Sequence, residues 1–202
     1  MNHERPDRRV TRTRRALREA LIGLILEKGY DAITVGDIVD RADVGRSTFY
    51  AHFVDKDALL LGGFSALPTL WAEESRGSDA ESGAIPFTFS LKMFRHADEE
   101  RRLFRALVGQ RSGALVQRQL DRVLSDLVRA DLERLHAVGD AHTLDVALRF
   151  VVSAYVGLLT WWLDHPTPAT PEQMDQAFRA LVLPGVAGFL GTASDVPRSR
   201  RA

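Results

Sequence analysis

The chain has 202 residues, of which 45% are hydrophobic and 27% are charged, and its 27 basic residues balance its 27 acidic residues. This composition is typical of a globular protein, and the length suits one core or a small domain joined to a larger one. The chain contains no cysteine, which excludes disulfides, thiol catalysis and thiolate metal sites.

Basic residues are concentrated near the N-terminus, where seven arginines and one acid lie between Arg5 and Arg18. This asymmetry favours contact with a polyanion, although charge alone supports a solvated, disordered terminus equally well. The terminus lacks the apolar segment of a signal peptide. The longest uncharged apolar run, 150–163, is shorter than the roughly 20 residues that a membrane-spanning helix needs. We therefore expect a cytoplasmic protein with no membrane partner.

Apolar residues recur with helical spacing along most of the chain, and there is little strand signal. The first expected helix covers 11–28, and Gly29 follows at its end. Thr34 followed by Asp37 is typical of a helix N-cap with an acid near the positive end of the helix. A short helix is therefore expected from 35 to about 41.

A second short helix is expected at 46–52, after a turn that contains a glycine. Phe49 and Phe53 are spaced to lie on its buried side, and a further helix begins near Lys56. Two short helices joined by a tight turn have the proportions of a helix-turn-helix, here at about 34–53, whose second helix reads the major groove of DNA. The spacing alone is a modest signal, because helical proteins without a DNA role also contain it.

The rest of the chain predicts longer helices. They are expected at 87–96, 99–108, 113–136, 143–163 and 171–190. A small polar segment at 75–83 indicates a loop, and Pro184 should kink the last helix. The pattern predicts an all-α protein with four parts: a flexible basic arm at 1–10, a domain with the helix-turn-helix at 11–58, a larger helical domain at 59–191, and a disordered tail at 192–202.

Four groups of residues between Ala32 and Leu59 are a more specific signal for DNA binding than the helical spacing of apolar residues. They are Thr34-Val35-x-Asp37-Ile38, Ala42-x-Val44, Thr48-Phe49-Tyr50-x-His52-Phe53 and Lys56-x-x-Leu59. With these residues the stretch resembles the DNA-binding domain of the tetracycline-repressor (TetR) family. Gly45 and Ser47 depart from the serine and the small residue that the family often has there, which leaves the operator sequence open.

The resemblance implies seven DNA-contacting side chains. Thr34 and Lys56 would bind phosphate, Arg46, Ser47 and Thr48 would face the major groove, and Tyr50 and His52 would approach backbone or base edges. Arginines before the first helix would reach the neighbouring backbone or the minor groove. The resemblance also implies a homodimer formed through the last two helices, which would bind a roughly palindromic, double-stranded DNA operator.

A small-molecule effector is a further implication of the resemblance. Its pocket could be built from Trp71, Phe89, Met93, Phe104, Tyr155 and Trp161, although aromatic residues at helical spacing are more typical of plain core. No catalytic, metal-binding, phosphate-loop or dinucleotide pattern is present, so we expect no cofactor and no enzyme. The resemblance implies a repressor that a ligand releases from its operator, with 11–58 as its DNA-binding domain and 59–191 as its regulatory and dimerisation domain. The alternatives are a protein-interaction adaptor and an enzyme with a vestigial helix-turn-helix.

Overall fold

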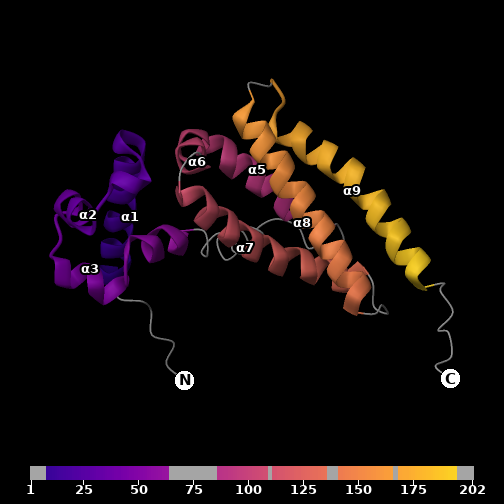
Figure 1. Ribbon diagram of the computed structural model, residues 1–202, viewed down its shortest axis with the longest axis horizontal. Helices are drawn as coiled ribbons and strands as arrows, with labels where there is room; N and C mark the ends of the chain where they lie inside the picture. The colour runs from indigo at the N-terminus through magenta and orange to yellow at the C-terminus, as the bar shows by residue number, and fades with distance from the viewer. Residues whose placement is uncertain (1–7, 64–85, 109–110, 136–140, 166–167, 195–202) are drawn as a thin grey trace. The chain divides into compact units, whose positions relative to one another are not determined.

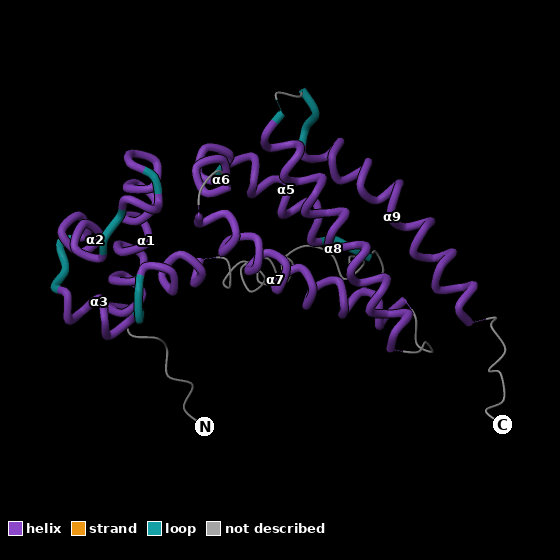
Figure 2. Tube along the Cα trace, in the orientation of Figure 1, coloured by secondary structure: helices purple, strands orange, loops and turns teal. Residues whose placement is uncertain are grey.

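The computed structural model describes residues 8–63, 86–108, 111–135, 141–165 and 168–194. Within these ranges every regular element is a helix and none is a strand, as Figures 1 and 2 show. The expected all-α fold is therefore confirmed. The chain divides into two compact groups of residues.

The first group is built around α1, Arg8–Lys28. It continues with a short 3-10 helix at Tyr30–Ala32, α2 at Val35–Ala42, α3 at Arg46–His52 and a helical stretch at 56–63. Its core consists of buried apolar side chains from these elements: Leu17, Leu21, Leu24, Ile25, Ile38, Val39, Phe49 and Leu59. Helices as short as α2 and α3 are marginal in isolation, so packing on this core stabilises them.

The turn between α2 and α3 begins at Asp43, which adopts the left-handed conformation with φ of 52°. Aspartate tolerates this conformation better than most residues with a side chain. The N–H of Val44 then donates to the carbonyl of Val39 at 3.1 Å, and Gly45 leads into α3 in extended conformation. The two short helices and the tight turn expected from the sequence are confirmed.

The first group also contains α6, Arg101–Val108, which packs against α1, together with the chain from 111 to 119. Phe104 and Leu107 are buried on α6. From the sequence, α6 is expected in the larger domain, 59–191, whereas in the structure α6 belongs to the group that contains the helix-turn-helix. The apolar face of α6 requires a covering partner, but its spacing does not reveal that the partner is α1.

The second group contains the other long helices. They are α5 at Phe89–Glu99, the part of α7 (Arg111–Leu135) from Leu120 onward, α8 at Ala141–Asp164 and α9 at Pro171–Ser194. α9 packs against both α5 and α8. Six buried aromatic side chains form the centre of this group: Phe87, Phe89, Phe94, Tyr155, Trp162 and Phe178. Neighbouring ring centroids lie 5.0 to 6.3 Å apart in edge-on or tilted pairs, the arrangement that aromatic rings prefer.

Several helix ends differ from the expected ones. α1 begins at Arg8, so residues 8–10 of the expected flexible arm are helical, and α9 continues through Pro184 to Ser194. α5 begins two residues later than expected because Phe87 has φ of 61°, which a helix cannot contain. The loop expected at 75–83 lies outside the described residues.

Among the described helices, α8 is long and apolar enough to cross a membrane. It is longer than the uncharged run at 150–163, since it begins at Ala141 and ends at Asp164. Half of its most apolar stretch is buried inside the protein, and one such helix is weak evidence for a membrane.

Candidate nucleic-acid interface

α2 begins with a capping box formed by Thr34 and Asp37, as the sequence predicts. The Asp37 N–H donates to the Thr34 hydroxyl at 3.2 Å, and the Asp37 carboxylate accepts from the N–H and the hydroxyl of Thr34, each at 2.7 Å. Lys28 Nζ lies 2.9 Å from the other carboxylate oxygen. The hydrogen bonds from Thr34 and Lys28 hold the pKa of Asp37 well below its usual range. Thr34 is therefore fixed at the start of α2, on an exposed part of the surface.

The outward side of α3 carries five of the predicted DNA-contacting side chains. Arg46, Ser47 and Tyr50 are exposed, whereas Thr48 and His52 are half-buried. Phe49 is fully buried on the opposite side, and its ring meets that of Tyr50 edge-on at 5.4 Å. The Tyr50 ring thus packs against the buried Phe49 ring while the Tyr50 side chain remains 58% exposed. Hydroxyls, an imidazole and a guanidinium are the groups that bind base edges and phosphates.

Arg46 also reaches back to the start of α2. Its Nη2 atom lies 3.2 Å from the position that a Cβ atom on Gly36 would occupy, and Oγ1 of Thr34 lies 3.4 Å from the same position. The guanidinium therefore lies against the backbone of α2 at a residue that has no side chain.

Lys56 connects the helical stretch 56–63 to the turn before α2. Its Nζ donates to the carbonyl oxygens of Ile33 at 2.8 Å and Tyr30 at 3.0 Å, and lies 4.4 Å from the centre of the Tyr30 ring. The Tyr30 hydroxyl donates to the carboxylate of Asp57. Burial and this hydrogen bond raise the pKa of Tyr30 far above its usual value. The intramolecular role of Lys56 has no sequence signal, because its partners lie more than 20 residues away. The phosphate contact predicted for Lys56 stays a prediction.

Some arginines of α1 make contacts inside the first group, and others are exposed. The Arg14 guanidinium lies 5.8 Å from the centre of the Phe53 ring, and Arg18 donates to the carbonyl of Gly62 at 3.5 Å, so both are used inside the first group. Arg8 and Arg12 are exposed. Residues 1–7, including Arg5, lie outside the described residues.

Two family models match this chain. Residues 17–62 match the model described as "Bacterial regulatory proteins, tetR family", and residues 86–183 match the model described as "Transcriptional regulator C-terminal region". The chain belongs to the tetR family. This tetR-family chain is 32% identical over 182 residues to an uncharacterized HTH-type transcriptional regulator, YxbF, of Bacillus subtilis (strain 168). The alignment covers 85% of the chain and 45% of YxbF, so the chain spans less than half the length of this curated relative.

Solved structures show the same fold as this tetR-family chain. A TetR transcriptional regulator from Streptococcus agalactiae 2603V has a TM-score of 0.60 and 24% identity, over 87% of this chain and 96% of that chain. FadR from Thermus thermophilus, a TetR-family transcriptional repressor in complex with lauroyl-CoA, has a TM-score of 0.59 and 20% identity, over 94% of this chain and 98% of that chain. At these identities the likeness supports the fold alone.

The residues predicted to line an effector pocket have different surroundings. Phe89 and Tyr155 are buried in the second group with ring centroids 5.4 Å apart, and Met93 is buried one turn further along α5. Phe104 is buried in the first group, on α6. Trp161 is 47% exposed on α8 and stacks on His165. Trp71 lies outside the described residues, and the pocket itself stays a prediction.

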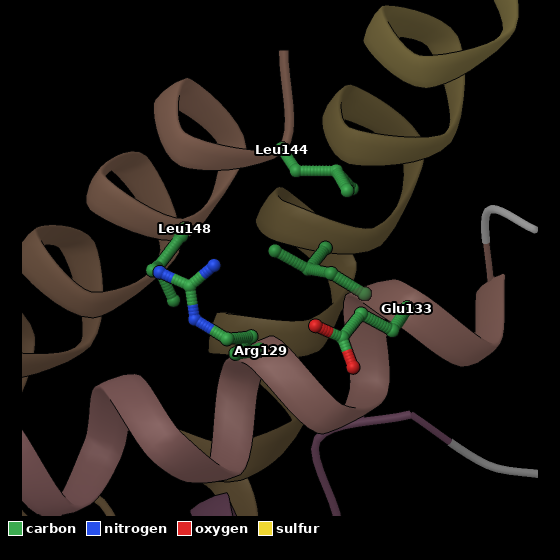
Figure 3. A pocket seen from close by; sticks show the side chains of 5 residues that line it. Arg129, Glu133, Leu144 and Leu148 are labelled. Carbon is green, nitrogen blue, oxygen red and sulfur yellow. The ribbon is translucent and has the colours of Figure 1, made fainter. Parts of the chain in front are cut away.

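A small hollow lies between α7 and α8 (Figure 3). It is lined by Arg129, Leu132, Glu133, Leu144 and Leu148, and its volume is about 10 Å³. This is about the space that one water molecule needs, so the hollow does not fit an organic effector. The described residues also contain no cluster of three or more histidine or carboxylate side chains that could hold a metal ion.

A buried polar network in the second group has no counterpart in the sequence pattern. Arg179 on α9 donates to the carbonyl oxygens of Pro86 at 2.7 Å and Phe87 at 2.8 Å, and its Nε lies 3.0 Å from Asp175. The N–H of Phe87 donates to Asp131 on α7 at 2.7 Å. These bonds hold Phe87 in its left-handed conformation. No spacing rule relates residues that are 44 to 93 positions apart, so only the fold reveals them.

Proposed function

We propose that this chain is a DNA-binding transcriptional regulator that represses transcription by occupying an operator and is released by a small-molecule ligand. The observation that carries the proposal is the outward face of α3, where Arg46, Ser47 and Tyr50 are exposed above a fully buried Phe49. Membership in a family of bacterial regulatory proteins supports it. Because a bacterial operator lies in the cytoplasm, we place this chain there as well.

Base recognition in this proposal belongs to the first turn of α3, and phosphate binding to its surroundings. Arg46, Ser47 and Thr48 face the base edges of the major groove, as the first residues of a recognition helix do. Tyr50 and His52 contact the backbone or base edges. Thr34 and Lys56 bind phosphates; two N–H groups of Lys56 are used on carbonyl oxygens, which leaves one for a phosphate oxygen.

A second copy of the chain is the proposed partner of α8 and α9. Phe150 on α8 is 53% exposed and Leu181 on α9 is 75% exposed. Glycines 157, 185 and 188 on the same helices have open space where a Cβ atom would be. Exposed apolar side chains beside small residues favour close packing of another helix pair. A two-fold dimer presents two α3 helices to a roughly palindromic site.

Release by a ligand is a shift between two populations of the dimer. A ligand that binds better to a form whose two α3 helices do not match the operator half-sites lowers the occupancy of the operator. FadR of Thermus thermophilus, a repressor solved in complex with lauroyl-CoA, is an example of this fold in a repressor that binds a ligand.

The first test is a gel-shift experiment with DNA upstream of the gene for this chain and of its neighbours. We expect sequence-specific binding that weakens steeply with salt, because phosphate contacts release counterions. Loss of binding in Arg46→Glu, at an exposed position, separates this function from a protein-interaction adaptor, whose partner binding this charge reversal leaves intact. Absence of specific binding to every genomic fragment contradicts the proposal.

A further inference from the structure

Gly36 lies inside α2, at a position where the helix itself does not need a glycine. Glycine is a poor helix former, and alanine at an ordinary helical position stabilises a helix relative to glycine. The position of Gly36 relative to α3 gives a different reason for it. The Nη2 atom of Arg46 lies 3.2 Å from the place of an added Cβ atom, closer than almost all Cβ contacts in proteins.

The missing side chain of Gly36 therefore leaves the space that the Arg46 guanidinium occupies. A Cβ atom at position 36 displaces the tip of Arg46 by a few tenths of an ångström, and a longer side chain displaces it further, whereas the hydroxyl of Thr34 lies 3.4 Å from the same point, at the edge of ordinary contact. The end of a long, exposed side chain moves at little cost in stability. Substitution of Gly36 thus changes where Arg46 points while the core of the first group stays intact.

Arg46 has the chemistry of base recognition. It is the first residue of α3, and the N-terminal residues of a recognition helix approach base edges. Within the described part of the chain no ion pair or hydrogen bond engages its guanidinium, and the residue is exposed. Arginine binds O6 and N7 of guanine with two parallel hydrogen bonds, and contact with Gly36 limits the conformations that must be lost on binding.

We propose that Gly36 is a specificity-determining residue: the space above its backbone positions Arg46 so that this arginine reads a guanine in the operator. This role rests on the proposed DNA-binding function, in which Gly36 and Arg46 together select a guanine. Arg46 makes the contact, and Gly36 acts through Arg46 as a positioning residue.

The experiment selects binding sites from random double-stranded DNA with the full chain, then measures affinity for the selected site and for versions with each base pair replaced. The variants are Gly36→Ala, Arg46→Ala and their combination. Gly23→Ala is the matched control, because the Arg41 guanidinium crowds Gly23 in the same way, at 3.3 Å, while Arg41 pairs with Glu27.

For the wild-type chain we expect one G·C pair in each half-site whose replacement weakens binding about ten- to a hundred-fold. Arg46→Ala should lose that preference, Gly36→Ala should reduce it at the same base pair, and the combined variant should lose no more than Arg46→Ala. Gly23→Ala should keep the preference, and Gly36→Ala should unfold at the same or a higher temperature than the wild type.

Three results overturn the inference. If Gly36→Ala keeps the guanine preference, Gly36 has no role in specificity. Equal weakening on every DNA sequence by Arg46→Ala assigns Arg46 to a phosphate. Wild-type protein without any sequence preference refutes the proposed function itself, so the two failures are distinct.

Discussion

The ammonium group of Lys56 lies 4.4 Å from the centre of the Tyr30 ring and donates to the Tyr30 carbonyl at 3.0 Å. A second bond to Ile33, at 2.8 Å, completes the connection between the helical stretch 56–63 and the turn before α2. This lysine therefore stabilises the first group in the absence of DNA. Its proposed phosphate contact is a second role, and the two roles are separable by measurement.

Lys56→Met should lower the free energy of unfolding by about 1 to 3 kcal/mol, because the part-buried carbonyl oxygen of Ile33 loses its Lys56 donor and that of Tyr30 keeps only the Ile33 N–H. Urea denaturation measures this loss. Operator binding by the same variant should also depend less on salt, with a log–log slope reduced by about one for each phosphate that Lys56 binds in the wild type. An unchanged slope, with stability reduced, assigns Lys56 to the fold alone.

Asp37→Asn should weaken the start of α2 in a pH-dependent way. The folded state lowers the pKa of Asp37 from 3.8, so the carboxylate stabilises the fold fully above that value and loses its effect as the pH falls through the folded pKa. The stability difference between wild type and Asp37→Asn should therefore be largest at neutral pH and shrink below about pH 4. Urea denaturation at several pH values measures it, with Asp40→Asn, an exposed position on the same helix, as control. A difference that does not vary with pH contradicts the pKa shift as its cause.

Arg179→Met should destabilise the chain by about 3 to 5 kcal/mol, because it leaves the carboxylate of Asp175 part-buried without its cation. The carbonyl oxygen of Pro86 also loses its Arg179 donor, while that of Phe87 keeps only the donors of Ser90. Arg95→Met is the matched control on the same group: Arg95 pairs with Glu172 at 2.9 Å, but both side chains are exposed, and such pairs contribute about 0 to 1 kcal/mol. Equal losses in thermal or urea unfolding would show that burial of the Arg179 pair has no special effect.

Tyr50→Ala and Thr48→Ala should affect DNA binding differently. Tyr50 is exposed, and its proposed contact is with the DNA backbone, so its loss should weaken all operator variants to a similar extent. Thr48 stands in the first turn of α3, so its loss should alter the preferred base at one position of the site. Affinities measured on a panel of single-base operator variants distinguish the two patterns. Equal weakening across the panel by Thr48→Ala refutes its assignment to base recognition.

Leu181→Glu should convert the proposed dimer into monomers and weaken operator binding, because it places a charge on the exposed apolar face of α9. Sedimentation velocity gives the oligomeric state. Leu26→Glu, at an exposed leucine of α1, should leave that state unchanged. If the Leu181 variant sediments like the wild type, the homodimer does not form through this face.

Much of the DNA-binding region could be predicted from the sequence because its signals are local. Thr34 and Asp37 are three residues apart and form the predicted capping box, and Phe49 lies on the predicted buried side of α3. Helical periodicity likewise predicts each long helix, because the apolar face of a helix repeats every three to four residues. The helix ends follow less directly from the pattern, as the start of α5 illustrates: nothing near Phe87 in the sequence signals a positive φ.

The all-α class, the helix-turn-helix at about 34–53 and the family all follow from the amino-acid sequence without coordinates. Contacts between residues far apart in the chain required the folded structure: α6 packs against α1, Lys56 binds carbonyls of the turn before α2, Arg179 holds Phe87, and Arg46 occupies the space above Gly36. The physical reason is range. Caps and periodicity follow from backbone geometry over a few residues, whereas the direction of a long side chain depends on which distant surface packing brings within its reach.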